Sequence, residues 1–156
     1  MGDTQAHATD ETLRRDEAVD ETLRRGFEAA WVQGSSPTID QYLPAEDAAS
    51  YLFTLAELVH IDLEFAWKAF AQLRHQAHTL ASGEELRRPD RLEDYLARFE
   101  GLQHPRILLE LIQHEYALRH RFTDHPALEE YRRRFPQFDL SAETLAAECG
   151  GGAVVG

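Results

Sequence analysis

Two carboxylates, Asp62 and Glu115, stand at matching positions in two apolar helix faces. The apolar positions around them run 55, 58, 59, 66 in one segment and 108, 111, 112 in the other. A carboxylate on such a face must be paired, solvated at a groove or protonated. One hypothesis is a catalytic acid/base pair. The hypothesis that we favour is two structural ion pairs, Asp62 with Arg98 and Glu115 with Arg134.

The other residue types that could do chemistry lack the required spacing. His114-Glu115 is a fragment of a zinc-protease motif, but Leu118 stands where the second histidine would be needed. No G-x-S-x-G is present, and the Gly-rich stretch 150–156 lacks the Lys-Ser/Thr of a phosphate loop. The sequence therefore predicts no catalytic residue, no metal site and no cofactor.

Helical periodicity dominates the elements that must position these residues, and Pro and Gly fall between the periodic segments. The sequence predicts an all-α fold. Residues 1–9 are predicted to be disordered, 10–140 to form one helical bundle, and 141–156 to be a weak helical turn followed by a flexible Gly-rich tail. The expected helices are 10–33, a short turn capped by Ser36, 45–81, 90–99 capped by Asp90 with Glu93, one from Pro105, and one from Pro126 to Pro136.

A short pattern of an apolar residue, an acid, any residue and a tyrosine occurs three times. The copies are PTIDQYL (37–43), DRLEDYL (90–96) and PALEEYR (126–132), and the last two continue to an Arg-Phe pair. The pattern predicts a compact bundle of diverged helix–turn–short-helix repeats. Its aromatic residues are candidates either for the core or for an interaction groove, since aromatic anchors carry much interface energy: Trp31, Tyr42, Trp67, Tyr95 and Tyr131.

Composition limits the classes of partner. The 156 residues include 28 Asp/Glu against 16 Lys/Arg, a formal charge of −12. A chain this acidic is a poor ligand for nucleic acid or for anionic membrane surfaces. It holds no stretch of about 20 apolar residues, and its first residues lack the form of a signal peptide. The sequence thus predicts a cytoplasmic protein that binds neither nucleic acid nor a membrane.

Five stretches taken together resemble the non-catalytic helical region that precedes the kinase domain in planctomycete serine/threonine protein kinases. They are FEAAW (27–31), PTIDQYL (37–43), LAELVHIDLE (55–64), LEDYLARF (92–99) and LEEYRRRFP (128–136), so the resemblance spans about residues 23–138 and departs from the family at 68–89.

The resemblance implies a regulatory or protein-interaction module whose partner is a kinase domain in cis or the substrates of that kinase. The chain has no V-A-I-K, H-R-D or D-F-G, so none of the kinase family's catalytic residues carries over. The chain itself is therefore predicted not to be an enzyme. Two alternatives stay open: a stand-alone helical adaptor, and a small helical metal-binding protein or enzyme using Asp62, His114 and Glu115.

Overall fold

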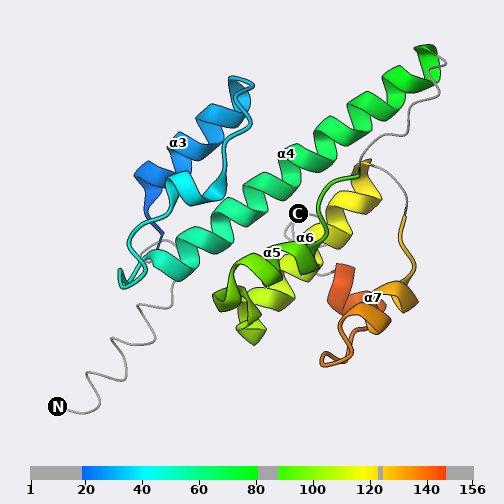
Figure 1. The fold of residues 1–156 in the computed structure, drawn as a ribbon. Coiled ribbons are helices and arrows are strands. Elements are labelled where there is room, and N and C mark those ends of the chain that lie inside the picture. The colour runs from blue at the N-terminus through cyan, green and yellow to red at the C-terminus, as the bar shows by residue number, and fades with distance from the viewer. Residues whose placement is uncertain (1–18, 81–87, 123–124, 147–156) are drawn as a thin grey trace, which may run out of the picture. The chain divides into compact units, whose positions relative to one another are not determined.

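A computed structural model describes residues 19–80, 88–122 and 125–146 of the chain. All regular structure within these ranges is helical, which confirms the predicted all-α class (Figure 1). The chain divides into two compact units, Met1–Asp62 and Leu63–Gly156, whereas the sequence predicts a single bundle over 10–140. The predicted disorder of 1–9 and the predicted Gly-rich tail, residues 149–156, lie outside the described residues.

The first unit contains α3 (Glu21–Val32), the 3₁₀ helix η1 (Ile39–Tyr42) and the start of α4 (Tyr51–Leu80). Asp20 has extended backbone angles, and its side chain accepts a hydrogen bond from the backbone N–H of Leu23 at 3.1 Å. This N-cap begins α3 at residue 21, so the predicted helix 10–33 is interrupted at Asp20, and its part before residue 19 lies outside the described residues.

The turn after α3 leads directly into η1. Gly34 has a φ of +82°, a left-handed conformation that glycine adopts without the steric cost of a side chain. Ser36 also has a positive φ, so the residue before η1 is Thr38 and not the predicted Ser36. The buried ring of Phe27 meets the edge of Tyr42, with ring centroids 5.5 Å apart, and this contact packs α3 against η1.

Helix α4 begins six residues later than the sequence predicts, because residues 46–50 form turns. Its Thr54 is fully buried, and the Oγ1 atom accepts a hydrogen bond from the backbone N–H of Asp20 at 2.8 Å. The N-cap residue of α3 is thereby tied to the first turns of α4.

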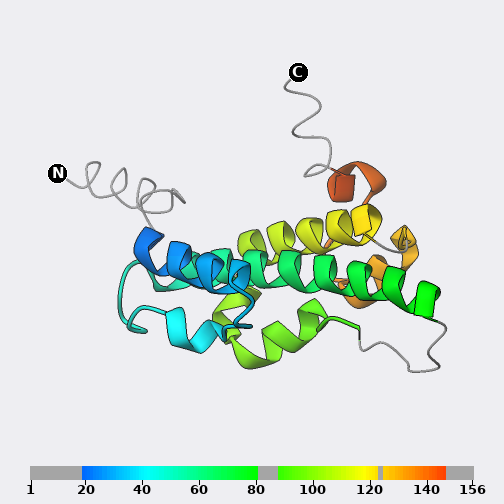
Figure 2. The same ribbon diagram turned by 90° about the horizontal axis from the view of Figure 1, so that it is seen from above.

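The second unit contains the rest of α4, then α5 (Leu92–Arg98), the 3₁₀ helix η2 (Glu100–Gln103), α6 (Pro105–Phe122) and α7 (Leu128–Arg134). Within this unit α6 runs beside the C-terminal part of α4 in both views (Figure 1 and Figure 2). Each copy of the tyrosine pattern lies on a short helix, η1, α5 or α7. The arrangement of these copies as diverged repeats stays a prediction.

The two Arg-Phe copies end their helices in the same way. The backbone N–H of Phe99 donates to the carbonyl of Tyr95, and that of Phe135 donates to the carbonyl of Tyr131, both at 2.9 Å. Both phenylalanines and both tyrosines are buried. The two copies therefore share a short helix whose tyrosine and phenylalanine enter the core of the second unit.

The cap of α5 differs from the predicted one. The backbone N–H of Arg91 donates to Oδ2 of Asp94 at 2.8 Å, so the capping pair is Arg91 and Asp94 and not Asp90 and Glu93. Glu93 does not take part in this cap, and its side chain instead binds Arg134 in α7.

Within the described ranges, no helix combines the length and apolar character that crossing a membrane requires.

Candidate functional site

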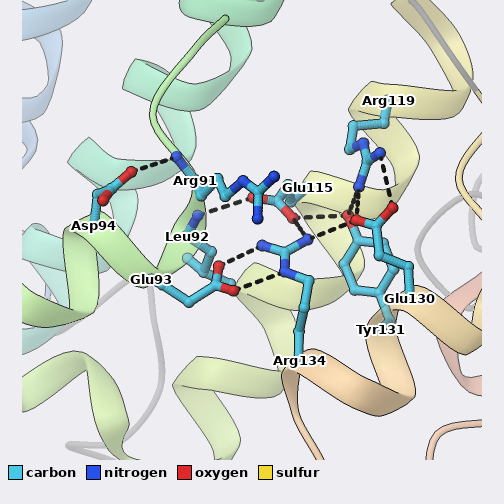
Figure 3. Close-up of polar contacts among 9 residues, drawn as sticks. All are labelled: Arg91, Leu92, Glu93, Asp94, Glu115, Arg119, Glu130, Tyr131 and Arg134. Carbon is cyan, nitrogen blue, oxygen red and sulfur yellow. Dashed lines mark hydrogen bonds and ion pairs between the residues drawn. The ribbon is translucent and has the colours of Figure 1, made fainter.

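Six side chains from α5, α6 and α7 form one partly buried charge network in the second unit, drawn in Figure 3. Its members alternate in charge along the contacts and include one tyrosine: Glu93, Glu115, Arg119, Glu130, Tyr131 and Arg134. We refer to these six residues as the charge network. It lies where the last turn of α7 meets the first turn of α5 and the middle of α6.

Glu115 is the most deeply buried acid of the charge network, with 1% of its surface exposed. Its Oε1 accepts from the hydroxyl of Tyr131 and from Nη1 of Arg134, each at 2.7 Å. Its Oε2 accepts from the backbone N–H of Leu92 at 2.9 Å. Both oxygens are thus occupied by donors from α5 and α7, which confirms the predicted Glu115–Arg134 ion pair and favours the structural hypothesis over a catalytic acid or base.

Arg134 connects α7 to both of the other helices. Its Nε and Nη2 bind the two oxygens of Glu93 in a bidentate pair, the Nε distance being 2.8 Å. Its Nη1 binds Glu115 and also lies 3.3 Å from Oε2 of Glu130. Burial lowers the pKa of the guanidinium, but hydrogen bonds and charge from Glu93 and Glu115 outweigh burial and raise that pKa above its usual value. Arg134 therefore carries its charge at every accessible pH.

The contact between Arg134 and Glu93 also changes the pKa of Glu93. Partial burial raises the pKa of Glu93, but the hydrogen bonds and charge of Arg134 outweigh burial and hold that pKa below its usual value. Bidentate Arg–carboxylate geometry is among the strongest polar contacts in proteins, and here it joins residues 41 positions apart.

Arg119 and Glu130 close the other side of the charge network. Both terminal nitrogens of Arg119 bind Glu130, with Nη2 at 3.2 Å from Oε1, and Nη1 lies 3.3 Å from the Tyr131 hydroxyl. Burial, followed by the neighbouring Glu115 charge, raises the pKa of Tyr131 above its usual value, so its hydroxyl remains a donor. The network thus links charged side chains of all three helices through hydrogen bonds and ion pairs.

Sequence reasoning missed Glu93, Arg119 and Glu130 as members of the charge network. Arg119 stands four residues after Glu115 on the same apolar face, which could have marked it as a second buried charge. Glu129 and Glu130 stand three and four residues before Arg132 and Arg134, a spacing that permits ion pairs on one helix face. The structure contains such contacts, since Glu129 pairs with Arg132 at 2.9 Å and Glu130 with Arg134.

The five candidate groove residues are not all surface residues. Tyr95 and Tyr131 are 2% and 0% exposed, so they pack in the core of the second unit and cannot line an open groove. Trp31 in α3 and Tyr42 in η1 are half-buried in the first unit. Trp67 in α4 is 4% exposed and borders a pocket, described next. Asp62 and Arg98 fall in different units, and their pairing stays a prediction.

A pocket of about 80 Å³ opens beside the charge network. It is bordered by one tryptophan, one proline, four arginines and two glutamates: Trp67, Arg88, Pro89, Arg91, Glu115, Arg119, Glu130 and Arg134. The Arg88 guanidinium lies 5.8 Å from the centre of the Trp67 ring. The pocket therefore combines an aromatic wall with a concentration of guanidinium groups.

The described residues do not assemble a metal site, because no three His, Cys, Asp or Glu side chains among them gather as ligands. Scanned against protein-family models, curated proteins and solved structures, the chain matched none of them.

Proposed function

We propose that the chain is a non-catalytic, regulatory protein-interaction module that acts in the cytoplasm and accompanies a serine/threonine kinase domain. The association with a kinase rests on the sequence resemblance over residues 23–138. The binding role rests on one observation, the arginine-rich pocket beside Trp67.

Tryptophan and arginine are the residue types most enriched among those that dominate binding energy in protein interfaces. Arg119 and Arg134 are held by the charge network, so this wall of the pocket is ordered before a partner arrives. A preorganised wall lowers the entropy cost of association. A catalytic role has less support, because both oxygens of the buried Glu115 are engaged in contacts between helices.

Selection from a random-peptide display library tests the binding role. The purified wild-type chain is used for selection, and binding of the synthesised peptides is then measured by fluorescence anisotropy. We expect the selected peptides to bind an Arg88→Gln/Arg91→Gln variant at least about tenfold more weakly, since charge-assisted contacts to each arginine are lost. Arg106 and Arg133 are exposed and do not border the pocket. Their double glutamine variant is the matched control and should bind like wild type.

Enrichment of no peptide, or equal binding to the wild type and both variants, would overturn the binding role at this pocket. The kinase association has a separate test, the reading frame beyond the codon for Gly156. A V-A-I-K, an H-R-D and a D-F-G in that frame support the association. A stop codon directly after Gly156 contradicts it and supports the stand-alone adaptor instead.

A further inference from the structure

The pocket beside the charge network is rich in hydrogen-bond donors and poor in free acceptors. The indole Nε1 of Trp67 is buried and finds no hydrogen-bond acceptor in the described part of the chain. Two carboxylates border the pocket, and both already accept hydrogen bonds. Glu115 accepts from Tyr131 and Arg134 through Oε1 and from the backbone N–H of Leu92 through Oε2. Glu130 accepts from Arg119 through both oxygens and from Arg134 through Oε2. A ligand that satisfies this pocket must therefore bring acceptors.

Charge points to the same class of ligand. Four arginines border the pocket against two glutamates, and positive charge still prevails when Glu93, the bidentate partner of Arg134, is included. Glu115 and Glu130 are each paired with arginine inside the charge network. Arg88 and Arg91 are exposed on the segment that leads into α5, where they can meet an anion from solvent.

Size restricts the ligand further. A volume of about 80 Å³ exceeds the roughly 30 Å³ share of one water molecule but is far below the ~300 Å³ or more of a site that encloses a whole small molecule. The pocket can thus take one anionic group, while the molecule that carries the group stays outside.

We propose that this pocket binds a phosphate monoester group. Three donor side chains outside the charge network border it, Trp67, Arg88 and Arg91, and a phosphate monoester offers three terminal oxygens and a charge of about −1.5 to −2 near neutral pH. A carboxylate has two oxygens and one charge. Guanidinium groups bind phosphate oxygens in a bidentate manner, which suits the paired arginines of the segment 88–91.

The side chains of Arg88 and Arg91 border different sides of the pocket. In Figure 3 the Arg91 side chain extends toward Glu115, along the wall that the charge network forms. Arg88 lies over the face of Trp67, so an anion held by Arg88 is placed next to the indole. Arg119 and Arg134 are neutralised by Glu93, Glu115 and Glu130 within the charge network, so the excess positive charge at the pocket comes from Arg88 and Arg91.

The source of the phosphate group, a phosphorylated side chain of a partner protein or free phosphate, rests on the proposed function. A titration followed by ¹H–¹⁵N NMR separates the two. The full chain is titrated with inorganic phosphate, with a phosphoserine peptide, with the same peptide unphosphorylated, and with the same peptide carrying aspartate at that position. The chain has two tryptophans, and a Trp67→Phe variant assigns the indole resonance of Trp67.

We expect inorganic phosphate and the phosphoserine peptide to shift the Trp67 indole resonance saturably, and the unphosphorylated peptide to leave it unmoved. The Arg88→Gln/Arg91→Gln variant should lose at least about tenfold in affinity for both ligands, since each loses charge-assisted hydrogen bonds. The Arg106→Gln/Arg133→Gln variant should match wild type. Since all four arginines are exposed, both variants should fold, and circular dichroism checks this.

Each remaining outcome decides a specific point. A Trp67 resonance that neither inorganic phosphate nor the phosphoserine peptide moves overturns the site, as does equal affinity in wild type and the Arg88→Gln/Arg91→Gln variant. Binding of the aspartate peptide as tight as the phosphoserine peptide overturns phosphate in favour of carboxylate. Binding of inorganic phosphate without the phosphopeptide supports the site and counts against the proposed protein-binding role at this pocket.

Discussion

The Nη1 atom of Arg134 lies 2.7 Å from Oε1 of Glu115, and these side chains are 10% and 1% exposed. The ion pair joins the last turn of α7 to the middle of α6. The contribution of this ion pair to stability depends on the neighbouring donors, since the backbone N–H of Leu92 and the hydroxyl of Tyr131 also bind the Glu115 carboxylate. A buried charge held in this way is costly to leave without its partners.

Replacing Glu115 by alanine should therefore destabilise the chain by about 3–5 kcal/mol, because Arg134 loses one anion and two further donors lose their acceptor. Urea unfolding followed by circular dichroism measures the change. Glu129 also pairs with an arginine, Arg132, but both of those side chains are exposed. Glu129→Ala is the matched control, with an expected loss below about 1 kcal/mol. Equal losses for the two variants would contradict a structural role for the Glu115 pair.

The Tyr131 hydroxyl should contribute measurably on its own, because it donates to a buried carboxylate at 2.7 Å. We expect Tyr131→Phe to cost about 1.5–3 kcal/mol, the range for hydrogen bonds to charged groups. Tyr116 packs edge-on against the Tyr131 ring and is a control of the same type. Thermal and urea unfolding of Tyr116→Phe should show a change within about 0.5 kcal/mol. A Tyr131→Phe variant as stable as wild type would show that the hydroxyl contributes nothing.

Stability should depend on pH through Glu93. Its pKa in the folded chain lies below its value in the unfolded chain, so the unfolded state binds the proton first as the pH falls. The contribution of Glu93 to stability is thus complete above the unfolded pKa of about 4.3 and is lost as the pH falls through the folded pKa. The free energy of unfolding of a Glu93→Gln variant should fall less steeply below about pH 4.3 than that of wild type. Identical slopes would contradict the effect.

In the first unit, Thr54 should be sensitive to loss of its hydroxyl oxygen. Thr54→Val keeps the volume but leaves the backbone N–H of Asp20 without its acceptor, at an expected cost of about 1–3 kcal/mol. Thr54→Ser keeps the acceptor and loses one methyl group, worth about 0.8 kcal/mol. Urea unfolding should therefore rank serine above valine in stability. The reverse order would show that packing at this position outweighs the hydrogen bond.

The amino-acid pattern was sufficient to predict the helical class and the partner of Glu115. Matching the third tyrosine motif to the apolar face that precedes it placed Arg134 opposite Glu115, and the pair is present. At α5, residue spacing alone did not determine which pair of residues caps the helix. Asp90 with Glu93 and Arg91 with Asp94 are both separated by three residues, so either could cap the helix, and the distant Arg134 decides which acid is free for it.

The contacts of Arg119 could not be predicted in the same way. A long side chain on an apolar helix face can reach past its neighbours or extend to water, and spacing alone does not distinguish these. Its partner Glu130 lies on the next helix, α7, 11 residues further along the chain, and His125 before α7 has a positive φ. The pairing is thus a property of tertiary packing.

The charge network also determines when the second unit can fold while the chain is being synthesised. Helices α5 and α7 have seven residues each, too short to be stable alone. Arg134 follows Glu115 by 19 residues. While the chain emerges from the ribosome, Glu115 must therefore stay hydrated until α7 has been made. The charge network can form only after α7 is available, so the folding of the second unit is expected to be a late and concerted step.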